Sequence, residues 1–356
     1  MVESSKKKKT GAAKSKKDSK PAIAFWDLKF NVAQLSEFTG VSRANIYKLI
    51  SEKVIQGEEV QNGASTKTIF SWEDLQTVIS SRFCEKREDL IDLQIKVFAN
   101  LKGGTGKSST SSQFAMAAAT MGYRVLLIDL DPQAQASLAL GFDNLEDNVP
   151  TIYNCLGERP GSPDYLPIEK CIQPVTPFLS LVRASFDLSQ LDFKLQTSRF
   201  GVTKLAEILD TLRPKFDLII IDTNPSGSIS NIHALMAADE ICVIAETDYM
   251  SVAGLRQFFK LLNELQDDFG ESFSPAVRVI ANKFDVREAI AQEALGSLRK
   301  NYGEQLAKIV IRKNVDLKEA QKRAMPIWAY NKRSSASKDL LALTHELLDE
   351  SGLSHD

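Results

Sequence analysis

The sequence has few cysteines, and their spacing does not suit a metal cluster. Its 356 residues include four, Cys84, Cys155, Cys171 and Cys242, with no C-x-x-C pair. This spacing argues against zinc ribbons and iron–sulfur centres, and the low number fits a reducing cytoplasm. No apolar run reaches about 18 residues, the length that a membrane-crossing helix needs. We therefore expect no membrane span.

A strong excess of one charge is also missing. The net charge is −2, so overall charge predicts no polyanionic partner. Residues 1–22 are the exception, with eight lysines up to Lys20 and only Glu3 and Asp18 as acids. We expect a disordered tail, either a solvated leader or an arm that adds affinity for nucleic acid. Without a following apolar segment, it is not a secretory signal.

The strongest functional pattern is residues 102–110, Lys-Gly-Gly-Thr-Gly-Lys-Ser-Ser-Thr. An apolar stretch, 95–100, precedes it and a helix-forming segment, 111–121, follows it. A strand, a glycine loop and a helix start gather backbone N–H groups around phosphate oxygens. Lys107 is expected to reach the β- and γ-phosphates, and the Ser108 hydroxyl to ligate Mg²⁺. The chain is therefore predicted to bind a nucleoside triphosphate.

The loop departs from the usual G-x-x-x-x-G-K-[ST] pattern. Leu101 stands where that pattern has its first glycine, and a second lysine, Lys102, lies five residues before Lys107. One lysine is enough to neutralise the phosphates of a monomeric site. A second lysine at the loop entry suits a site in which it reaches a nucleotide held by another copy of the chain.

From Asp92 onward, short apolar runs alternate with helical patterns. The runs are rich in Val, Ile and Leu and mostly continuous, which is typical of parallel strands covered by helices on both faces. They are residues 95–100, 124–129, 179–183, 218–222, 241–246, 277–282 and 306–311. Residues 144–177 are proline-rich and are expected to form an irregular insert or surface loops. We predict an α/β phosphate-loop domain over residues 92–356.

Three aspartates follow two of these runs. Asp129 and Asp131 come at the end of one strand, where open α/β folds bind ligands. One can organise Mg²⁺ and its waters while the other positions the attacking water, although strand-end aspartates also cap helices. Asp222 is expected to support Mg²⁺ from beyond its direct ligands, and the following Asn224 and Pro225 to form a loop that senses the γ-phosphate.

Asn282 ends a later run. Its amide is suited to hydrogen-bond an adenine, but an asparagine that only forms a turn fits the same position. The residues expected to bind the nucleotide are Lys102, Gly103, Gly104, Thr105, Gly106, Lys107, Ser108, Ser109 and Asn282.

Residues 23–88 are predicted to form a small helical module. Helical patterns at 30–40 and 43–50 flank Gly40, as in a helix-turn-helix. Arg43, Asn45 and Lys48 would face outward on the second helix and suit base edges or phosphates. A helical hairpin that binds nothing is the alternative. Residues 67–75 are expected to form a strand and a capped helix, a layout like the winged helix-turn-helix modules of MerR-type regulators.

Cations are frequent between residues 311 and 323. Arg312 and Lys313 belong to this stretch and are candidates for a phosphate-binding face, although solvated helix faces have a similar composition.

Taken together, these residues resemble the ParA family of plasmid and chromosome partition ATPases. The resemblance covers about residues 95–345 and is carried by residues 102–110, 125–133, 216–227, 282–283 and 309–320. With the N-terminal module, it resembles the long subtype, which can repress its own operon. Two departures are visible: Asn224 replaces the first of two prolines, and Gln321 replaces the proline of an S-E-A-P segment.

The resemblance implies an ATPase in which two subunits of a homodimer enclose two ATP molecules. Lys102 matches the lysine that crosses to the partner's nucleotide, and Asp131 the residue needed for hydrolysis. Arg312 matches a residue implicated in nonspecific DNA binding. Lys107, Ser108, Asp129 and Asp222 match the phosphate and Mg²⁺ residues. A ParB-type partner would stimulate hydrolysis, and the protein would be cytoplasmic and nucleoid-associated.

Three alternatives share the loop. A MinD-like membrane-cycling ATPase is disfavoured because residues 339–356 are acidic. A nucleotide-sensing transcription regulator would not need Asp131. A metabolic enzyme of the superfamily, such as an amidoligase, would need neither Lys102 nor the N-terminal module.

Overall fold

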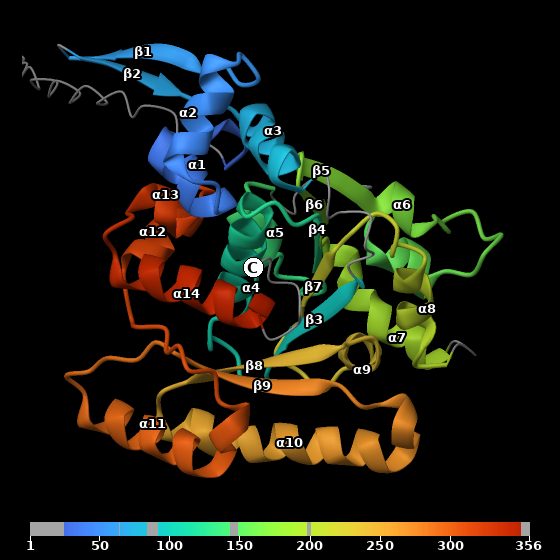
Figure 1. Cartoon of the computed structure of the whole chain (residues 1–356). Coiled ribbons are helices and arrows are strands. Elements are labelled where there is room, and N and C mark those ends of the chain that lie inside the picture. Colours follow the sequence, from blue (N-terminus) through green and yellow to red (C-terminus); the bar gives the residue numbers. More distant parts are fainter. Residues whose placement is uncertain (1–24, 64, 84–91, 143–148, 198–200, 350–356) are drawn as a thin grey trace, which may run out of the picture.

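A seven-stranded sheet forms the centre of the molecule (Figure 1). The computed structural model describes residues 25–63, 65–83, 92–142, 149–197 and 201–349. The strand order is β5-β6-β4-β7-β3-β8-β9, and every neighbouring pair is parallel except β5–β6. The strands are β3 (Gln94–Ala99), β4 (Val125–Asp129), β5 (Ile172–Thr176), β6 (Leu179–Val182), β7 (Leu218–Asp222), β8 (Glu240–Glu246) and β9 (Ala276–Asn282). The predicted α/β class is confirmed.

Helices cover both faces of the sheet. One face packs against α4 (Lys107–Thr120), α5 (Gln135–Ala139), α12 (Asp316–Lys322), α13 (Ile327–Tyr330) and α14 (Ser335–Asp349). The other packs against α6 (Ile168–Cys171), α7 (Leu191–Thr197), α8 (Lys204–Asp210), α9 (Ile229–Met236), α10 (Tyr249–Phe269) and α11 (Ala289–Tyr302). Within β7, Leu218 and Ile220 join the first core, and Ile219 and Ile221 the second. Successive side chains point to opposite faces, so burial of both faces makes the strand apolar throughout.

Two strand-level predictions were wrong. Residues 306–311 form no strand: they meet β9 through bonds such as Ala307 N to Val279 O (2.8 Å) and Ile311 N to Ala281 O (2.9 Å). Residues 144–177, expected to be irregular, contain α6 and the edge strand β5. Pro174 lies inside β5, which an edge strand tolerates because its outer side needs no ladder donor.

The N-terminal module, defined here as residues 25–83, contains α1 (Val32–Thr39), α2 (Arg43–Ser51), the hairpin β1 (Glu58–Asn62) and β2 (Ser65–Ile69), and α3 (Trp72–Phe83). Helix α1 begins after Phe30 because Phe30 pairs with Phe70 in a β-bridge and Asn31 caps the helix. Gly40 ends α1 with a φ of 66°. Ser42 caps α2 through the Asn45 N–H (3.2 Å). The predicted basic tail and most of residues 84–93 lie outside the described residues.

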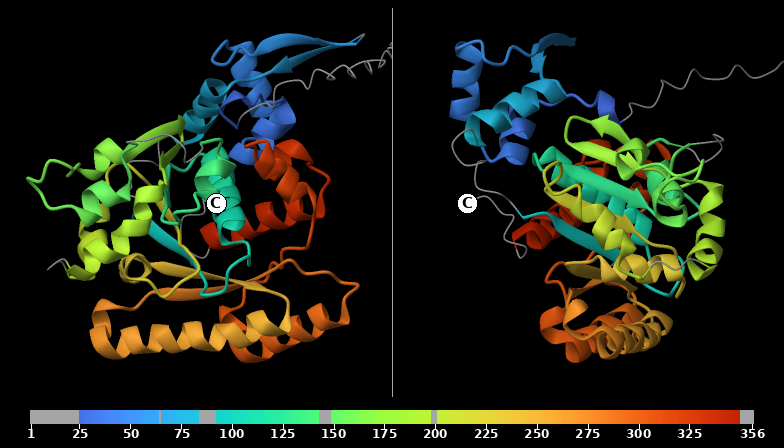
Figure 2. Two further views of the ribbon diagram at one scale, coloured as in Figure 1. Left: turned by 180° about the vertical axis from the view of Figure 1, so that it is seen from behind. Right: turned by 90° about the vertical axis from the view of Figure 1, so that its right-hand side faces the viewer.

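This module packs on the main domain and shares a core with it. Phe38 lies against Trp328 of α13, with ring centroids 4.6 Å apart. The Phe25 N–H donates to the Ala324 carbonyl (3.1 Å). The views from two further directions show α1 and α3 above the α4 and α12–α13 region (Figure 2). The module is therefore attached to α13, to the segment between α12 and α13, and to the turn that follows α4.

The contact between α3 and the main domain predicts an effect on stability. Gly122 has a φ of 96°, and a Cβ there would lie 2.8 Å from the Ile79 Cδ1 atom. We expect Gly122→Ala to lower the free energy of unfolding by about 1–3 kcal/mol. Urea unfolding measures it.

The matched control is Gly296→Ala within α11. Its Cβ would meet nothing within 4 Å, so the alanine should be neutral or raise stability by about 0.5–1 kcal/mol through helix propensity. Equal effects of the two substitutions would contradict the packing argument.

Candidate nucleotide and magnesium site

The glycine loop joins the end of β3 to the start of α4. Gly104 and Gly106 have φ values of 76° and 96°, which favour glycine. A Cβ at Gly106 would also collide with the Asn282 amide. The start of α4 has no side-chain cap among the described residues. Backbone N–H groups of the first turn are thus available to an anion, and the helix end adds partial positive charge.

Lys107 is buried at the start of α4 and lies close to carboxylates. Its Nζ donates to the Lys102 carbonyl oxygen (3.2 Å). Burial lowers the pKa of Lys107, while the negative charges of Asp222 and Asp131 oppose that shift. The predicted phosphate lysine is therefore desolvated, held by a backbone carbonyl and stabilised in its charged form by the negative charges of Asp222 and Asp131.

Asp129 is fully buried at the end of β4 and is held by its own loop. One carboxylate oxygen accepts from the Ser137 hydroxyl (2.7 Å) and N–H (2.8 Å), and the other from the Asp131 N–H (3.1 Å). Burial raises the pKa of Asp129 to about 6, and these hydrogen bonds oppose the rise. Asp131 is nearly buried and accepts from the Gln133 N–H (2.9 Å).

Asp222 lies beside Asp129, since the two are register partners in β7 and β4. Its Oδ1 accepts from the Ser111 hydroxyl (3.1 Å), but its buried Oδ2 has no hydrogen-bond partner among the described residues. Burial and the charge of Asp129 raise the pKa of Asp222 well above its usual range, while Ser108 and Lys107 favour the ionised form. A buried carboxylate oxygen without a partner is costly. A hydrated Mg²⁺ beside Ser108 would supply the missing positive charge, so these residues fit the predicted metal.

Lys102, the second lysine of the loop, forms an ion pair within its own chain. Its Nζ contacts both carboxylate oxygens of Asp248 (2.8 and 3.1 Å) and the Ser251 hydroxyl (2.8 Å). Both side chains of the ion pair remain about one third exposed, at 33% and 34%. Asp248 also caps α10. Sequence reasoning missed it because it lies 146 residues away and no motif marks it.

Asn282 supports the loop rather than standing free at the strand end. Its Nδ2 donates to the Thr105 carbonyl (2.8 Å), and its Oδ1 accepts from the Lys283 N–H (2.8 Å). The hydrogen bond from the Lys283 N–H supports a turn-forming role for Asn282. Adenine recognition by Asn282 stays a prediction.

Two other predicted positions lie against the loop. Pro225, after β7, would be 3.7 Å from a Cβ at Gly103. Gln321, the departure from the family segment, accepts a hydrogen bond from the Ser109 hydroxyl (3.1 Å). Asn224 instead accepts from the Asn231 amide, through its carbonyl (2.9 Å) and Oδ1 (3.0 Å).

The five residues predicted to bind DNA separate into two places. Arg43, Asn45 and Lys48 are exposed together on α2. Arg312 and Lys313 lie in the main domain and are both in ion pairs. The Arg312 guanidinium contacts both carboxylate oxygens of Asp339 (2.6 and 2.9 Å), and Lys313 contacts Glu288 (3.1 Å). The structure therefore does not bring these five residues into one surface.

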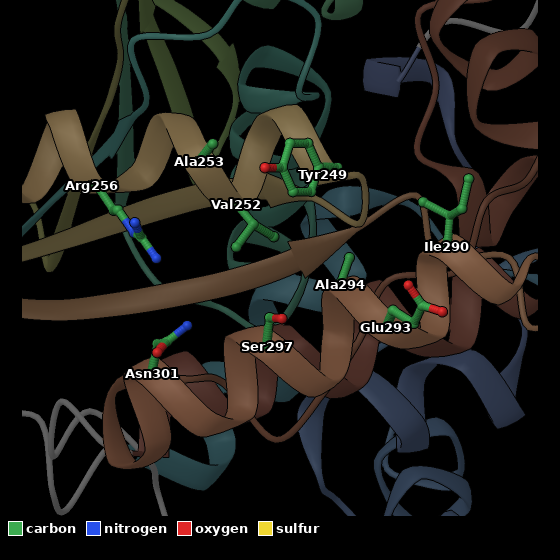
Figure 3. A pocket seen from close by; sticks show the side chains of 9 residues that line it. All are labelled: Tyr249, Val252, Ala253, Arg256, Ile290, Glu293, Ala294, Ser297 and Asn301. Carbon is green, nitrogen blue, oxygen red and sulfur yellow. The ribbon is translucent and has the colours of Figure 1, made fainter.

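A groove of about 340 Å³ runs between α10 and α11 (Figure 3). Tyr249, Val252 and Arg256 of α10 face Ile290 and Ala294 of α11 across it. Its lining contains none of the loop residues or aspartates described above. It is thus separate from the nucleotide site, although Tyr249 directly follows Asp248.

The uncapped helix start, the buried lysine and the buried carboxylates at the strand ends are features of a phosphate-loop nucleoside triphosphatase. A family model described as an AAA domain matches residues 93–274, about half of the chain. The chain is similar to the cell division protein PomZ of Myxococcus xanthus, with 31% identity over 254 residues, 71% of this chain and 77% of that protein. The chromosome partitioning protein ParA of Caulobacter vibrioides is 28% identical over 263 residues, covering 72% and 94%.

Solved structures share the fold. The Cyanothece McdA–ATP complex matches with a TM-score of 0.65 at 21% identity, covering 74% of this chain and 98% of that one. The chain belongs to the ParA family of partition ATPases. It is accordingly an ATP hydrolase of the partitioning or positioning type, and its cofactors are ATP and Mg²⁺.

The geometry around Asp222 predicts how its substitution affects metal binding. We expect Asp222→Asn to weaken Mg²⁺ binding by about 10- to 100-fold, as for other supporting groups around metals. Stability without Mg²⁺ should be unchanged or higher, because a desolvated carboxyl group is removed. Thermal unfolding with ATP and either Mg²⁺ or EDTA measures both effects.

Asp210→Asn is the control, since the Asp210 side chain on α8 is 64% exposed. It should retain the full Mg²⁺-dependent stabilisation. If Asp222→Asn kept it as well, Asp222 would have no part in the metal site.

Proposed function

We propose that this protein is a DNA-segregation ATPase in which ATP joins two subunits through Lys102, and the dimer binds DNA without sequence preference. A ParB-type partner accelerates hydrolysis, and hydrolysis releases the DNA. The observation that carries this proposal is the position of Lys102 at the open edge of the site. Lys107 is the lysine expected to neutralise the phosphates held by its own loop, so Lys102 is left for a different nucleotide.

Exposed apolar side chains at the same edge of the sheet support a second copy as the partner surface. Phe186 follows the end of β6, Tyr249 and Met250 that of β8, and Val286 that of β9, each within four residues. They are between 63% and 77% exposed. Tyr249, Met250 and Val286 follow the neighbouring strands β8 and β9, whereas Phe186 follows β6, four strands away from β8 along the same edge. Exposed large apolar side chains on neighbouring strand ends are typical of an interaction surface. Both the lysine and these side chains would be covered by a facing subunit.

The ion pair between Lys102 and Asp248 does not prevent Lys102 from moving to the nucleotide of a facing subunit. A partly exposed ion pair contributes about 0–1 kcal/mol. The triphosphate of a facing subunit offers several negative charges in a site that closure would dehydrate, where electrostatic attraction is stronger. Lys102 therefore has a more favourable partner once two loaded subunits meet.

This proposal predicts a selective defect for Lys102→Ala. ATP should no longer produce a dimer, and hydrolysis with DNA and the ParB-type partner should fall to the basal level. ADP binding should change by less than about threefold, since Lys107 and the loop remain. Light scattering after size exclusion, with a slowly hydrolysed ATP analogue, measures the dimer.

Lys260→Ala removes an exposed lysine from α10 and serves as the control for lost charge. It should dimerise normally. ATP-dependent dimers of Lys102→Ala with undiminished turnover would refute the proposal.

The N-terminal module is the proposed site of operator binding and autorepression. Helix α2 exposes Arg43, Asn45 and Lys48, it follows a tight turn at Gly40, and the β1–β2 hairpin lies beside it in sequence as a wing would. A second helix presented in this way suits the major groove. Arg312 and Lys313 remain candidates for nonspecific binding, but each would first have to leave its ion pair.

The relatives suggest two kinds of cargo for this ATPase. DNA is the cargo that the chromosome partitioning relatives favour, and the cell division relative keeps a protein assembly as the second candidate. A membrane-cycling role has less support. Helix α14 buries its apolar side chains Leu340, Leu343, Leu347 and Leu348 in the core that includes α4. Among the described residues, no helix combines the length and apolar character that crossing a bilayer requires.

The α2 surface predicts a salt-sensitive DNA defect. We expect Lys48→Ala to weaken DNA binding by the module and to reduce the slope of log affinity against log salt by about 1, as for one lost phosphate contact. Arg43→Ala should weaken operator DNA more than random DNA if Arg43 reads a base. Fluorescence anisotropy over a salt series measures both.

Lys300→Ala, on the exposed side of α11, controls for net charge and should bind as the unaltered protein does. Identical DNA affinities for all three variants would leave α2 without a role in DNA binding.

A further inference from the structure

Side chains donate hydrogen bonds to three peptide carbonyls of the glycine loop. The Lys102 carbonyl accepts from Lys107 Nζ (3.2 Å), the Gly104 carbonyl from Lys283 Nζ (2.5 Å), and the Thr105 carbonyl from Asn282 Nδ2 (2.8 Å). Lys107 belongs to the loop motif itself. The other two donors are consecutive residues at the end of β9, and the ATPase reaction as described above gives Lys283 no role.

The direction of these carbonyls decides the direction of the neighbouring N–H groups. All peptide bonds of the described chain are trans, so each carbonyl and the N–H of the next residue point to opposite sides. When Lys283 holds the Gly104 carbonyl, it turns the Thr105 N–H away from β9. Asn282 does the same for the Gly106 N–H. A phosphate cradle needs N–H groups, not carbonyls, on its inner side.

Gly104 is the position where the loop most needs such a restraint. Its φ is 76° and a Cβ there would meet nothing within 4 Å, so neither a side chain nor close packing fixes this peptide. If the peptide rotated, its carbonyl dipole would point its negative end at the phosphates. A cationic donor on the outside keeps the carbonyl in place.

The backbone of Lys283 is arranged for this contact. Its φ is 56°, in the left-handed region that lysine rarely adopts. The ammonium also lies 3.4 Å from a Glu246 carboxylate oxygen at the end of β8. The side chain thus links two strand ends to the loop, and the unfavourable backbone is retained where it serves this link.

We propose that Lys283 is a positioning residue for nucleotide binding, which acts through the Gly104 peptide. It shapes the cradle from the side away from the phosphates and need not touch the nucleotide. The competing explanation is that Lys283 serves only as a turn residue after β9. The two explanations differ in what they predict for glycine at this position.

The test is the affinity for ADP with Mg²⁺, measured by isothermal titration calorimetry, which requires no dimer and no turnover. We expect Lys283→Met and Lys283→Gly to raise the Kd by about 5- to 20-fold, since both lack the charged donor. Lys283→Arg retains a cationic donor and should stay within about threefold of the unaltered protein. Lys283→Gly should unfold at the same or a higher temperature, because glycine adopts this φ readily.

Lys308→Met, at an exposed lysine in the segment beside β9, should leave the Kd unchanged. A turn-only role predicts instead that Lys283→Gly binds ADP normally and that Arg gives no advantage over Met. Either of these results would overturn the proposal. Circular dichroism of each variant excludes misfolding as the cause of a weak Kd.

Discussion

The site depends on a balance of buried charge at the carboxyl end of the parallel sheet. Lys107, Asp129, Asp131 and Asp222 all lie below a tenth of full exposure, in surroundings where an uncompensated charge is strongly unfavourable. One ammonium group faces three carboxyl groups, so this set is short of positive charge. Mg²⁺ bound beside these groups would supply it. The phosphates of ATP would bring further negative charge, which the loop lysines and backbone N–H groups would neutralise. The nucleotide and the metal are therefore needed together.

The sheet makes this balance possible because its topology brings distant segments to one edge. Asp129 and Asp222 are cross-strand partners although they lie far apart in the chain. At the opposite end of the same strand pair, Arg124 contacts Asp217, which lies 93 residues away in the sequence. That opposite end carries its own ion pair between Arg124 and Asp217 (2.6 Å). Charged groups thus lie at both ends of β7, and the four residues between them, 218–221, are fully apolar and buried.

Local pattern was enough to predict six strands, the glycine loop and the aspartates that follow β4 and β7. These features are encoded within a few neighbouring residues, by continuous apolar runs that end in carboxylates. The edge strand β5 was missed because Pro174 and its proline-rich surroundings indicate a loop. Contacts between remote segments were not predictable: Lys102 with Asp248, Arg312 with Asp339 and Lys283 with Gly104 each depend on how the strands are ordered. The role of a cation in a sequence cannot be assigned until its counter-charge is known.

The attachment of the N-terminal module to α13 has an optical consequence. The chain has three tryptophans, Trp26, Trp72 and Trp328. The Trp72 indole N–H donates to the Phe25 carbonyl (3.4 Å) inside the module, and Trp328 stacks at a tilt on Phe38 across the junction. Both indoles are almost completely shielded from solvent. Separation of the module from α13 would expose Trp328 to water and shift its emission to longer wavelength. The intrinsic fluorescence of this ATPase therefore reports whether the N-terminal module is attached to the main domain.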